Sequence, residues 1–197
     1  AASDVYKRQY QASLSNTLAS YELKDQIDIM YATPILNKGK MDVQTEANGS
    51  TAIVALSFNH QLSAITIVIK KADDIKETLV LQKVELVNYP ASVRMDIQTG
   101  QLTTSDTKAD YPIPLAAPIT ITPTEATVAT NYLLWPGETP TFRFSISGHT
   151  YEVRPSQSFI AAKKQKYTFT IQAEDINVGA SINPWTEGPG GSGEIGI

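Results

Sequence analysis

The sequence predicts an all-β protein folded as an antiparallel β-sandwich, and three observations lead to that fold class. Apolar and β-branched residues alternate with polar residues at a period of two in many short segments, as they do in half-buried strands. Turn-forming residues separate those segments at short intervals. The chain shows no helical pattern of ten or more residues. About ten short strands remain, and a sandwich is a common way to bury them.

The composition fits a globular body and excludes several classes of function. Hydrophobic residues make up 42% of the 197 residues and charged residues 18%, which supplies enough apolar material for a core. The net charge of −4 gives no basic surface of the kind that binds DNA or RNA. No apolar run approaches the length of a membrane span. Cysteine is absent, which excludes disulfides and thiolate chemistry.

Residues 1–45 are expected to form an N-terminal remnant or connector outside the sandwich. Leu14, Leu18 and Tyr21 stand at helical spacing and predict one short amphipathic helical turn. Arg8 completes a Lys-Arg pair that would suit a protease, but a solvated basic pair is the preferred interpretation. The first residues contain no apolar stretch of the signal-peptide type, so an export signal is not present in this sequence.

Residues 46–183 are expected to form the sandwich, and Thr51–Lys71 is the stretch around which it is built. We interpret this stretch as two central strands, joined or bent at Asn59–Gln61. A buried helix is the competing interpretation of so apolar a run. The alternation of isoleucine with other residues across Ile65–Ile69 favours strands, because it repeats every second residue.

The remaining strands follow from alternation and from the turns between them. They are expected at Thr78–Tyr89, Ser92–Ile97, Thr127–Trp135, Thr141–Ser147, Thr150–Val153, Lys166–Gln172 and Ile176–Ile182. Pro112–Pro123 is expected to be extended, with its early prolines at a sheet edge or outside a ladder. The strand at Thr78–Tyr89 should contain a β-bulge at Gln82–Lys83, where two polar residues adjoin. The clearest hairpin should turn at Gly148–His149.

Residues 184–197 are expected to be a glycine-rich C-terminal tail with the composition of a linker. Ile195 and Ile197 nevertheless stand two residues apart at its end, which is the spacing of neighbours on one face of a strand. Two interpretations stay open at this point: a disordered terminus without a role, and a segment that acts as a strand.

No constellation in the sequence points to catalysis, to a metal site or to a cofactor. The two histidines, His60 and His149, fall in a predicted strand break and a predicted turn, and a structural or solvated role is the simpler one for both. The acidic pairs Asp73–Asp74 and Glu174–Asp175 lack the alternate spacing of a calcium loop. We therefore expect a protein that is not an enzyme.

The aromatic residues leave a second kind of function open. Trp135 and Trp185, together with nine tyrosines, would suit a platform on which sugar rings stack. Scattered aromatic residues in a β-sandwich are more often part of the core.

Three stretches carry a resemblance to a known family. They are Phe58, His60 and Leu62 before Ile65–Lys70; Ala161–Ile171; and Ile182–Gly188, and Asp28–Ala32 adds a further similarity. In their order and spacing they resemble the fimbrillin family of Bacteroidales bacteria, whose members are pilus subunits and anchored adhesins. The resemblance covers Asp25 to Gly188, although Ala161 and Ala162 stand where the family usually has a glycine. Family members also carry a whole β-sandwich upstream of Asp28–Ala32, so we expect this chain to be truncated at its N-terminus.

The resemblance implies a transthyretin-like sandwich of Greek-key type, exported to the outer surface of the cell. Family subunits join when a strand of one subunit fills a groove in the next, which is a form of strand addition. Other pilus subunits are therefore the implied partners, with host or bacterial surface ligands as further ones. On this view Ile195 and Ile197 belong to the candidate donated strand. A carbohydrate-binding surface module on a similar sandwich is the alternative.

Overall fold

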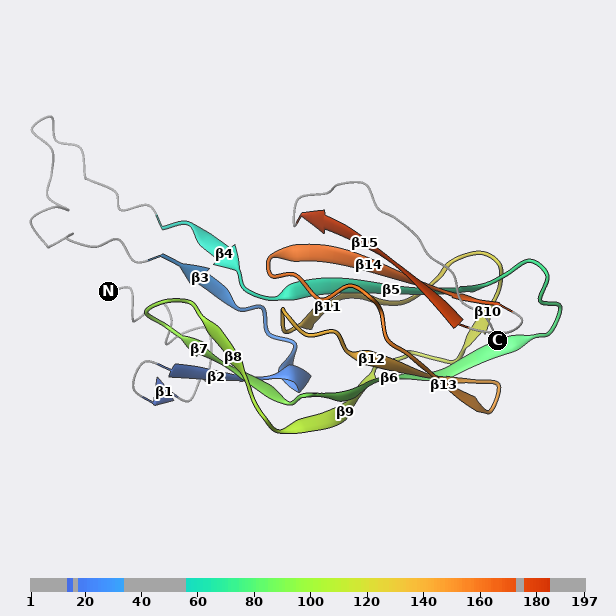
Figure 1. The fold of residues 1–197 in the computed structure, drawn as a ribbon, viewed down its shortest axis with the longest axis horizontal. Coiled ribbons are helices and arrows are strands. Elements are labelled where there is room, and N and C mark those ends of the chain that lie inside the picture. Colours follow the sequence, from blue (N-terminus) through green and yellow to red (C-terminus); the bar gives the residue numbers. More distant parts are fainter. Residues whose placement is uncertain (1–13, 16–17, 34–55, 173–175, 185–197) are drawn as a thin grey trace, which may run out of the picture.

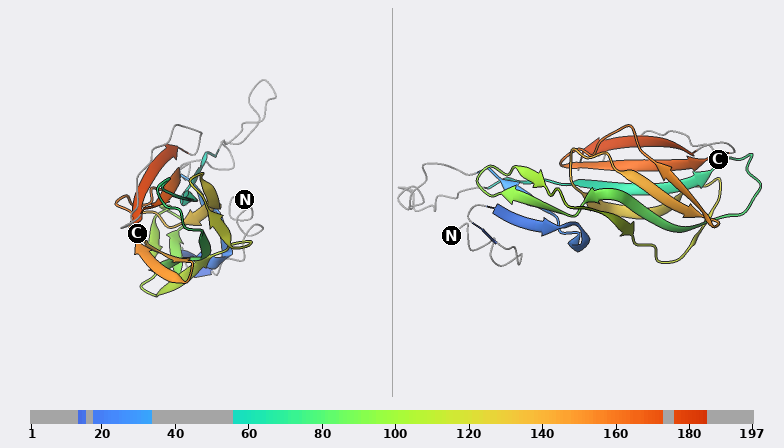
Figure 2. Two further views of the ribbon diagram at one scale, coloured as in Figure 1. Left: turned by 90° about the vertical axis from the view of Figure 1, so that its right-hand side faces the viewer. Right: turned by 60° about the horizontal axis from the view of Figure 1, so that its bottom comes forward.

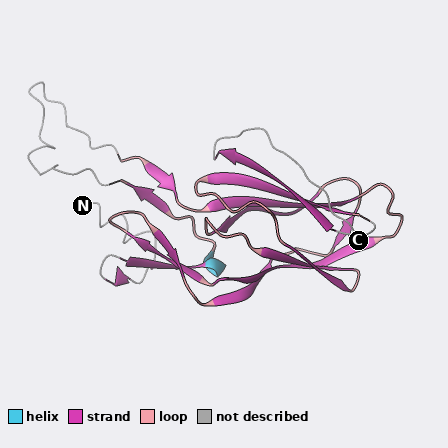
Figure 3. Cartoon of the chain, in the orientation of Figure 1, coloured by secondary structure: helices cyan, strands magenta, loops and turns pink. Residues whose placement is uncertain are grey.

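The computed structural model describes residues 14–15, 18–33, 56–172 and 176–184, and most of them lie in β-strands (Figure 3). One short 3-10 turn, Leu23–Asp25, interrupts the strands of the described part. Within these residues there is no helix with the length and apolar character needed to cross a membrane.

The strands are labelled in chain order. They are β1 (Leu14–Ser15), β2 (Leu18–Glu22), β3 (Met30–Ala32), β4 (Phe58–His60), β5 (Ser63–Lys71), β6 (Leu79–Pro90), β7 (Ser92–Asp96), β8 (Leu102–Thr104), β9 (Lys108–Ile113), β10 (Ile119–Ile121), β11 (Ala126–Leu134), β12 (Thr141–Ile146), β13 (His149–Val153), β14 (Lys163–Ile171) and β15 (Ile176–Pro184).

Two sheets packed face to face form the body of the molecule (Figure 1). Sheet I has the order β11-β5-β14-β15, and sheet II has the order β10-β6-β12-β13, with β9 also paired to β6. The pairings are antiparallel except that β5 and β14, the two central strands of sheet I, run parallel. The structure therefore confirms an all-β sandwich dominated by antiparallel pairing.

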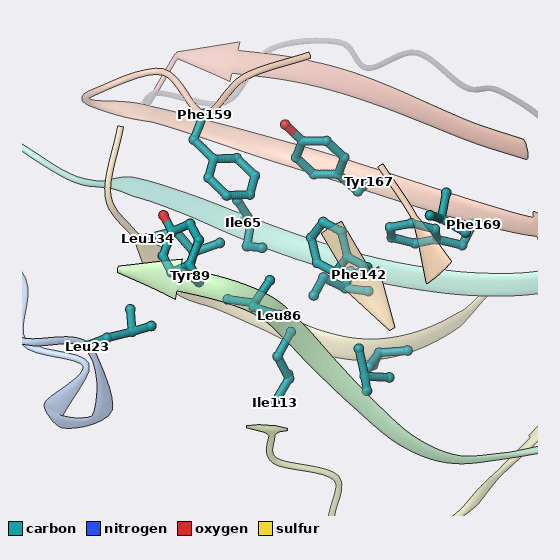
Figure 4. Close-up of a cluster of buried hydrophobic side chains, with 14 of the residues drawn as sticks. Leu23, Ile65, Leu86, Tyr89, Ile113, Leu134, Phe142, Phe159, Tyr167 and Phe169 are labelled. Carbon is teal, nitrogen blue, oxygen red and sulfur yellow. The ribbon is translucent and has the colours of Figure 1, made fainter. Parts of the chain in front are cut away.

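Aromatic rings from both sheets meet in the core (Figure 4). Phe169 of β14 lies with its ring centroid 4.7 Å from that of Phe144 and 5.1 Å from that of Phe142, both on β12. These are the separations and tilted geometries that aromatic pairs prefer. The alternation of the sequence explains the contact, because every second residue of each strand faces the opposite sheet.

The long strand β6 links the sandwich to a smaller sheet. Its predicted bulge is confirmed: Ser145 pairs with Lys83 and Ile146 with Leu81, which leaves Gln82 as the extra residue. Beyond Ala91 the chain continues directly into β7, and β7 lies between β2 and β8 in the small sheet β1-β2-β7-β8.

The helical turn predicted near the N-terminus is wrong. Leu18–Glu22 is a strand that pairs antiparallel with β7, and its alternate residues Ala19 and Tyr21 are buried. Apolar residues three or four positions apart fit one face of a helix, but the same segment can instead pair with a neighbouring strand. Here β7 supplies the edge with which it pairs. This strand lies in residues 1–45, the predicted connector, but it pairs with β7, which lies in residues 46–183, the predicted sandwich. The boundaries between the predicted domains remain predictions.

A two-stranded ribbon formed by β3 and β4 lies beside the small sheet (Figure 2). Of the two central strands predicted within Thr51–Lys71, β5 is one, but β4 belongs to the ribbon and not to the sandwich. The break predicted at Asn59–Gln61 is also displaced, because Asn59 and His60 pair within β4 and the chain leaves the strand only at Gln61. Tyr31 of β3 fixes the ribbon to the small sheet: its hydroxyl donates to the Gln98 carbonyl at 2.5 Å. Its ring lies over Gly100 so closely that any Cβ there would overlap it.

Replacing Phe169 by alanine should lower the free energy of unfolding by about 3–5 kcal/mol, because a buried ring is lost and the sheets cannot close the space. Urea unfolding at neutral pH measures the change. Phe58→Ala on the exposed face of β4 is the matched control and should change stability by no more than about 0.5 kcal/mol. Equal effects of the two substitutions would contradict the packing described for the core.

Gly100→Ala should loosen the ribbon as well as strain the backbone, because Gly100 has a φ of +74° and a Cβ there collides with Tyr31. Amide hydrogen exchange in β3 and β4 should become faster. Gly148→Ala is the control: Gly148 also has a positive φ, +85°, but a Cβ there meets nothing within 4 Å. If amide hydrogen exchange in β3 and β4 became faster in both variants, or in neither, the contact between Tyr31 and Gly100 would not be what holds the ribbon to the small sheet.

Candidate functional site

The two histidines lie on different elements in the described part of the chain. His60 Nδ1 lies 2.7 Å from Asp28 Oδ2, so the pair joins the end of β4 to the segment that precedes β3. His149 is exposed in the first position of β13. No group of three or more histidine, aspartate or glutamate side chains among the described residues could hold a metal ion.

Trp135 is part of the core and does not provide a surface for stacking sugars. Only 2% of it is exposed, and its indole Nε1 donates to the Pro90 carbonyl at 3.1 Å. In return the Tyr89 hydroxyl donates to the Trp135 carbonyl at 3.0 Å. Burial, with Glu138 nearby, raises the pKa of Tyr89 well above its ordinary value. The other tryptophan, Trp185, lies outside the described residues.

Most of the other sequence-based candidates lie outside the described residues. Arg8, Ile195 and Ile197 lie outside the described residues, as does the acidic pair Glu174–Asp175. The second acidic pair, Asp73–Asp74, is exposed in the turn between β5 and β6. There the Asp73 carbonyl accepts a hydrogen bond from Lys76 Nζ at 2.8 Å.

Exposed apolar side chains gather at one end of the molecule, and sequence reasoning missed this surface. Of the six large hydrophobic residues exposed in the described part, five form what we call the apolar end: Leu18, Met30, Leu56, Phe58 and Ile97. Leu18, Met30 and Phe58 belong to the small sheet and the ribbon, which share the left-hand end of Figure 1. Leu56 precedes β4 and Ile97 follows β7 in the chain. The sixth, Ile160, lies in the loop before β14.

The two faces of the ribbon differ in character. Residues directly opposite in an antiparallel pair share a face, so Met30 with His60 and Ala32 with Phe58 lie on one side. Tyr31 lies on the other side, which is closed by the small sheet. Phe58 is 45% exposed and Met30 37%. No third strand of the described part pairs with the ribbon.

The sandwich itself ends in open strand edges. Sheet I ends at β15 and sheet II at β13 within the described residues. An edge strand offers backbone N–H and C=O groups to any added strand. The arrangement can therefore accept extended peptide by backbone pairing, and the ribbon combines such an edge with apolar side chains.

The outward face of sheet II carries a charged row. Arg143 of β12 makes an ion pair at 2.8 Å with Glu152 on the neighbouring strand β13. It makes another at 2.6 Å with Asp110 on β9, which lies beyond β6. The hydrogen bond from the Asn88 backbone N–H, together with Arg143, lowers the pKa of Asp110 from its ordinary value. The cation is matched by acidic neighbours, so this row holds strands together and offers no anion site.

Asp110→Asn should make stability less dependent on acid pH. Because the pKa of Asp110 in the fold lies below its ordinary 3.8, its carboxylate stabilises the fold above that pH, and the contribution is lost as pH falls through the lowered pKa. Urea midpoints measured from about pH 6 to pH 2 should fall less steeply in the variant. Asp106→Asn, in the exposed turn before β9, is the control and should keep the wild-type slope. Identical slopes for all three proteins would refute the assignment.

The comparisons with known proteins agree with this architecture. A search among curated proteins found no match. Among solved structures, the chain is similar to "a putative cell adhesion protein" from Bacteroides uniformis, with a TM-score of 0.63 and 19% identity over 91% of this chain and 70% of that one. A second protein of the same description, from Bacteroides ovatus, gives a TM-score of 0.53 and 14% identity, over 92% of this chain and 67% of the other. At these identities the likeness shows a shared fold.

A family model gives the identification. The model described as fimbrillin-like matches residues 3–185, which is nearly the whole chain. The sandwich, the small sheet and the ribbon all fall inside the matched range. This chain belongs to the fimbrillin-like family.

Proposed function

We propose that the protein is a non-enzymatic subunit of a cell-surface pilus, or an adhesin component, that assembles by strand addition. The observation that carries the proposal is the ribbon, which joins open strand edges to an exposed apolar face at Met30 and Phe58. Membership of the fimbrillin-like family and the fold shared with the two Bacteroides proteins support the class of function.

Strand addition explains why those two features occur together. An added strand forms ladder hydrogen bonds with an open edge, which supply affinity whatever the side chains are. Its alternate side chains then contact one face of the sheet, which supplies specificity. The ribbon presents Met30, Ala32 and Phe58 on one such face.

A segment of suitable chemistry exists in the chain itself. Ile195 and Ile197 lie two residues apart, so in an extended strand both side chains point to one side. Residues 185–193, rich in glycine, would serve as the tether. In our proposal this segment of one subunit pairs with the ribbon of the next, and the chain works at the outer surface of the cell. Its partners are other pilus subunits and, beyond them, host or bacterial surface ligands.

Deleting Glu187–Ile197 should abolish self-association while the fold is retained. The mass of the particles, measured by light scattering after gel filtration, should change from a concentration-dependent series to a monomer. Circular dichroism should show the same strand content and melting behaviour for both chains. Assembly that continues unchanged after the deletion would remove the tail from the mechanism.

The acceptor surface needs a separate test. Phe58→Ser in the full chain should weaken association as strongly as the deletion, since the added strand loses its apolar contact. Ile160→Ser is the matched control, because Ile160 is 38% exposed but lies outside the apolar end. Equal association of the two variants would show that the ribbon is not the acceptor.

A further inference from the structure

In the described part of the chain, β11 is the edge strand of sheet I on the side opposite β15. Its backbone pairs with a strand on one side only, and Thr127, Thr130 and Asn131 in it are exposed. An edge of this kind offers N–H and C=O groups to any extended chain, so proteins protect such edges from unwanted pairing.

Two bulges protect the first part of this edge. Compared with β5, β11 has one extra residue between Thr127 and Ala129 and another between Ala129 and Tyr132. Asn131, in the second bulge, has a φ of +52°. Bulges twist an edge strand and interrupt its ladder, so an added strand could not keep its register there. Beyond the second bulge the pairing is regular as far as Leu134.

The side chain of Gln26 occupies the regular part that remains. Its Nε2 donates to the Leu133 carbonyl at 3.1 Å, and its Oε1 accepts from the Leu133 N–H at 2.9 Å. Both backbone groups of Leu133 therefore point away from β5, as alternation along a strand requires. A side-chain amide carries the same donor and acceptor as a backbone peptide group. Gln26 thus takes the place of one residue of an added strand.

The local backbone holds Gln26 in this position. Gln26 ends the 3-10 turn Leu23–Asp25, cyan in Figure 3, with φ 49° and ψ 38° in the left-handed region. That region is unfavourable for a residue with a Cβ and is kept where a contact requires it. The Leu23 carbonyl accepts from the backbone N–H of Gln26 at 3.2 Å and from its Nε2 at 3.0 Å. Leu23 is itself buried and donates its N–H to the Ala91 carbonyl at 3.0 Å, which fixes the turn to the body.

The neighbouring edge of sheet II is protected in a different way. Strands β9 and β10 both pair with β6, and β10 continues into β11 through residues 122–125. Pro112 lies within β9 and has no N–H to offer to an added strand. Pro118 directly precedes β10. On this side of the sandwich, the place where regular pairing is prevented by a single side chain is therefore the Leu133 position of β11.

We propose that Gln26 is a specificity-determining residue that closes the β11 edge of sheet I. Without its amide, a second copy of the chain would pair there through its own β11. Two Leu133 residues facing each other across a two-fold axis would exchange both of the hydrogen bonds that each now makes with Gln26. The closure stands independently of the function proposed above. Its consequence rests on that function: strand addition is directed away from this edge and towards the ribbon.

Hydrogen exchange at the Leu133 amide, measured by NMR, tests the closure. In the wild-type chain Gln26 holds this proton, which should exchange slowly at every protein concentration. Gln26→Leu keeps a similar volume without a polar group, and in dilute solution the proton should exchange about tenfold faster. In concentrated solution a second copy should fill the edge, and exchange should become about tenfold slower again. A hundredfold dilution should reverse this protection.

Two other variants exclude simpler causes. Gln82→Leu is the matched control, because Gln82 Oε1 accepts from the Gly148 N–H at 3.0 Å but β6 has strands on both sides. It removes a comparable bond and adds the same apolar side chain without opening an edge, so Leu133 should stay protected. Gln26→Asn suits the left-handed backbone but is one methylene too short to bridge to Leu133. It should therefore behave as Gln26→Leu does.

An unchanged rate at Leu133 in both Gln26 variants would overturn the proposal. A faster rate that stays the same at high concentration would also overturn it, since Gln26 would then only anchor the turn. The same measurement in the Phe58→Ser chain separates this edge from the ribbon: protection of Leu133 that persists there supports pairing through β11, and protection that disappears there overturns it. Wild-type assembly that Phe58→Ser leaves unchanged would refute the ribbon as acceptor, whereas the exchange at Leu133 would still decide the closure of β11.

Discussion

The parallel pairing of β5 with β14 is the constraint on which the rest of the structure depends. It joins residues a hundred positions apart, with Ala64 beside Lys164 and Ile69 beside Phe169. Through it the N-terminal and C-terminal halves of the described chain form one sheet, whose inner face carries the isoleucines of β5 and the rings of β14. Those rings meet β12 across the core, so the position of sheet II follows from the same pairing. Parallel strands need a long connection, and here that connection contains every strand of sheet II.

Beyond β2, which pairs with β7, the N-terminal segment is fixed to the rest of the structure by side-chain hydrogen bonds. The side-chain amide of Gln26 donates to the Leu133 carbonyl at 3.1 Å and accepts from the Leu133 N–H at 2.9 Å. A backbone neighbour would make the same two bonds, so the side chain extends the pairing of β11. Tyr31 then joins the ribbon to the small sheet. These contacts leave the apolar face of the ribbon outward, where a partner can reach it.

Alternation within single strands is a local property, and the sequence alone was sufficient to predict it. The fold class, the hairpin of Thr141–Val153 and the bulge at Gln82 follow from the order of apolar and polar residues, because each depends on neighbours a few positions away. The hairpin turn lies one residue earlier than predicted, at Ser147–Gly148, where both residues have positive φ. Only the tertiary structure decided that Leu18–Glu22 is a strand, that Trp135 is buried and that five exposed hydrophobic residues share one end. Each of these depends on contacts between segments far apart in the chain, and no short pattern encodes which distant edge a segment meets.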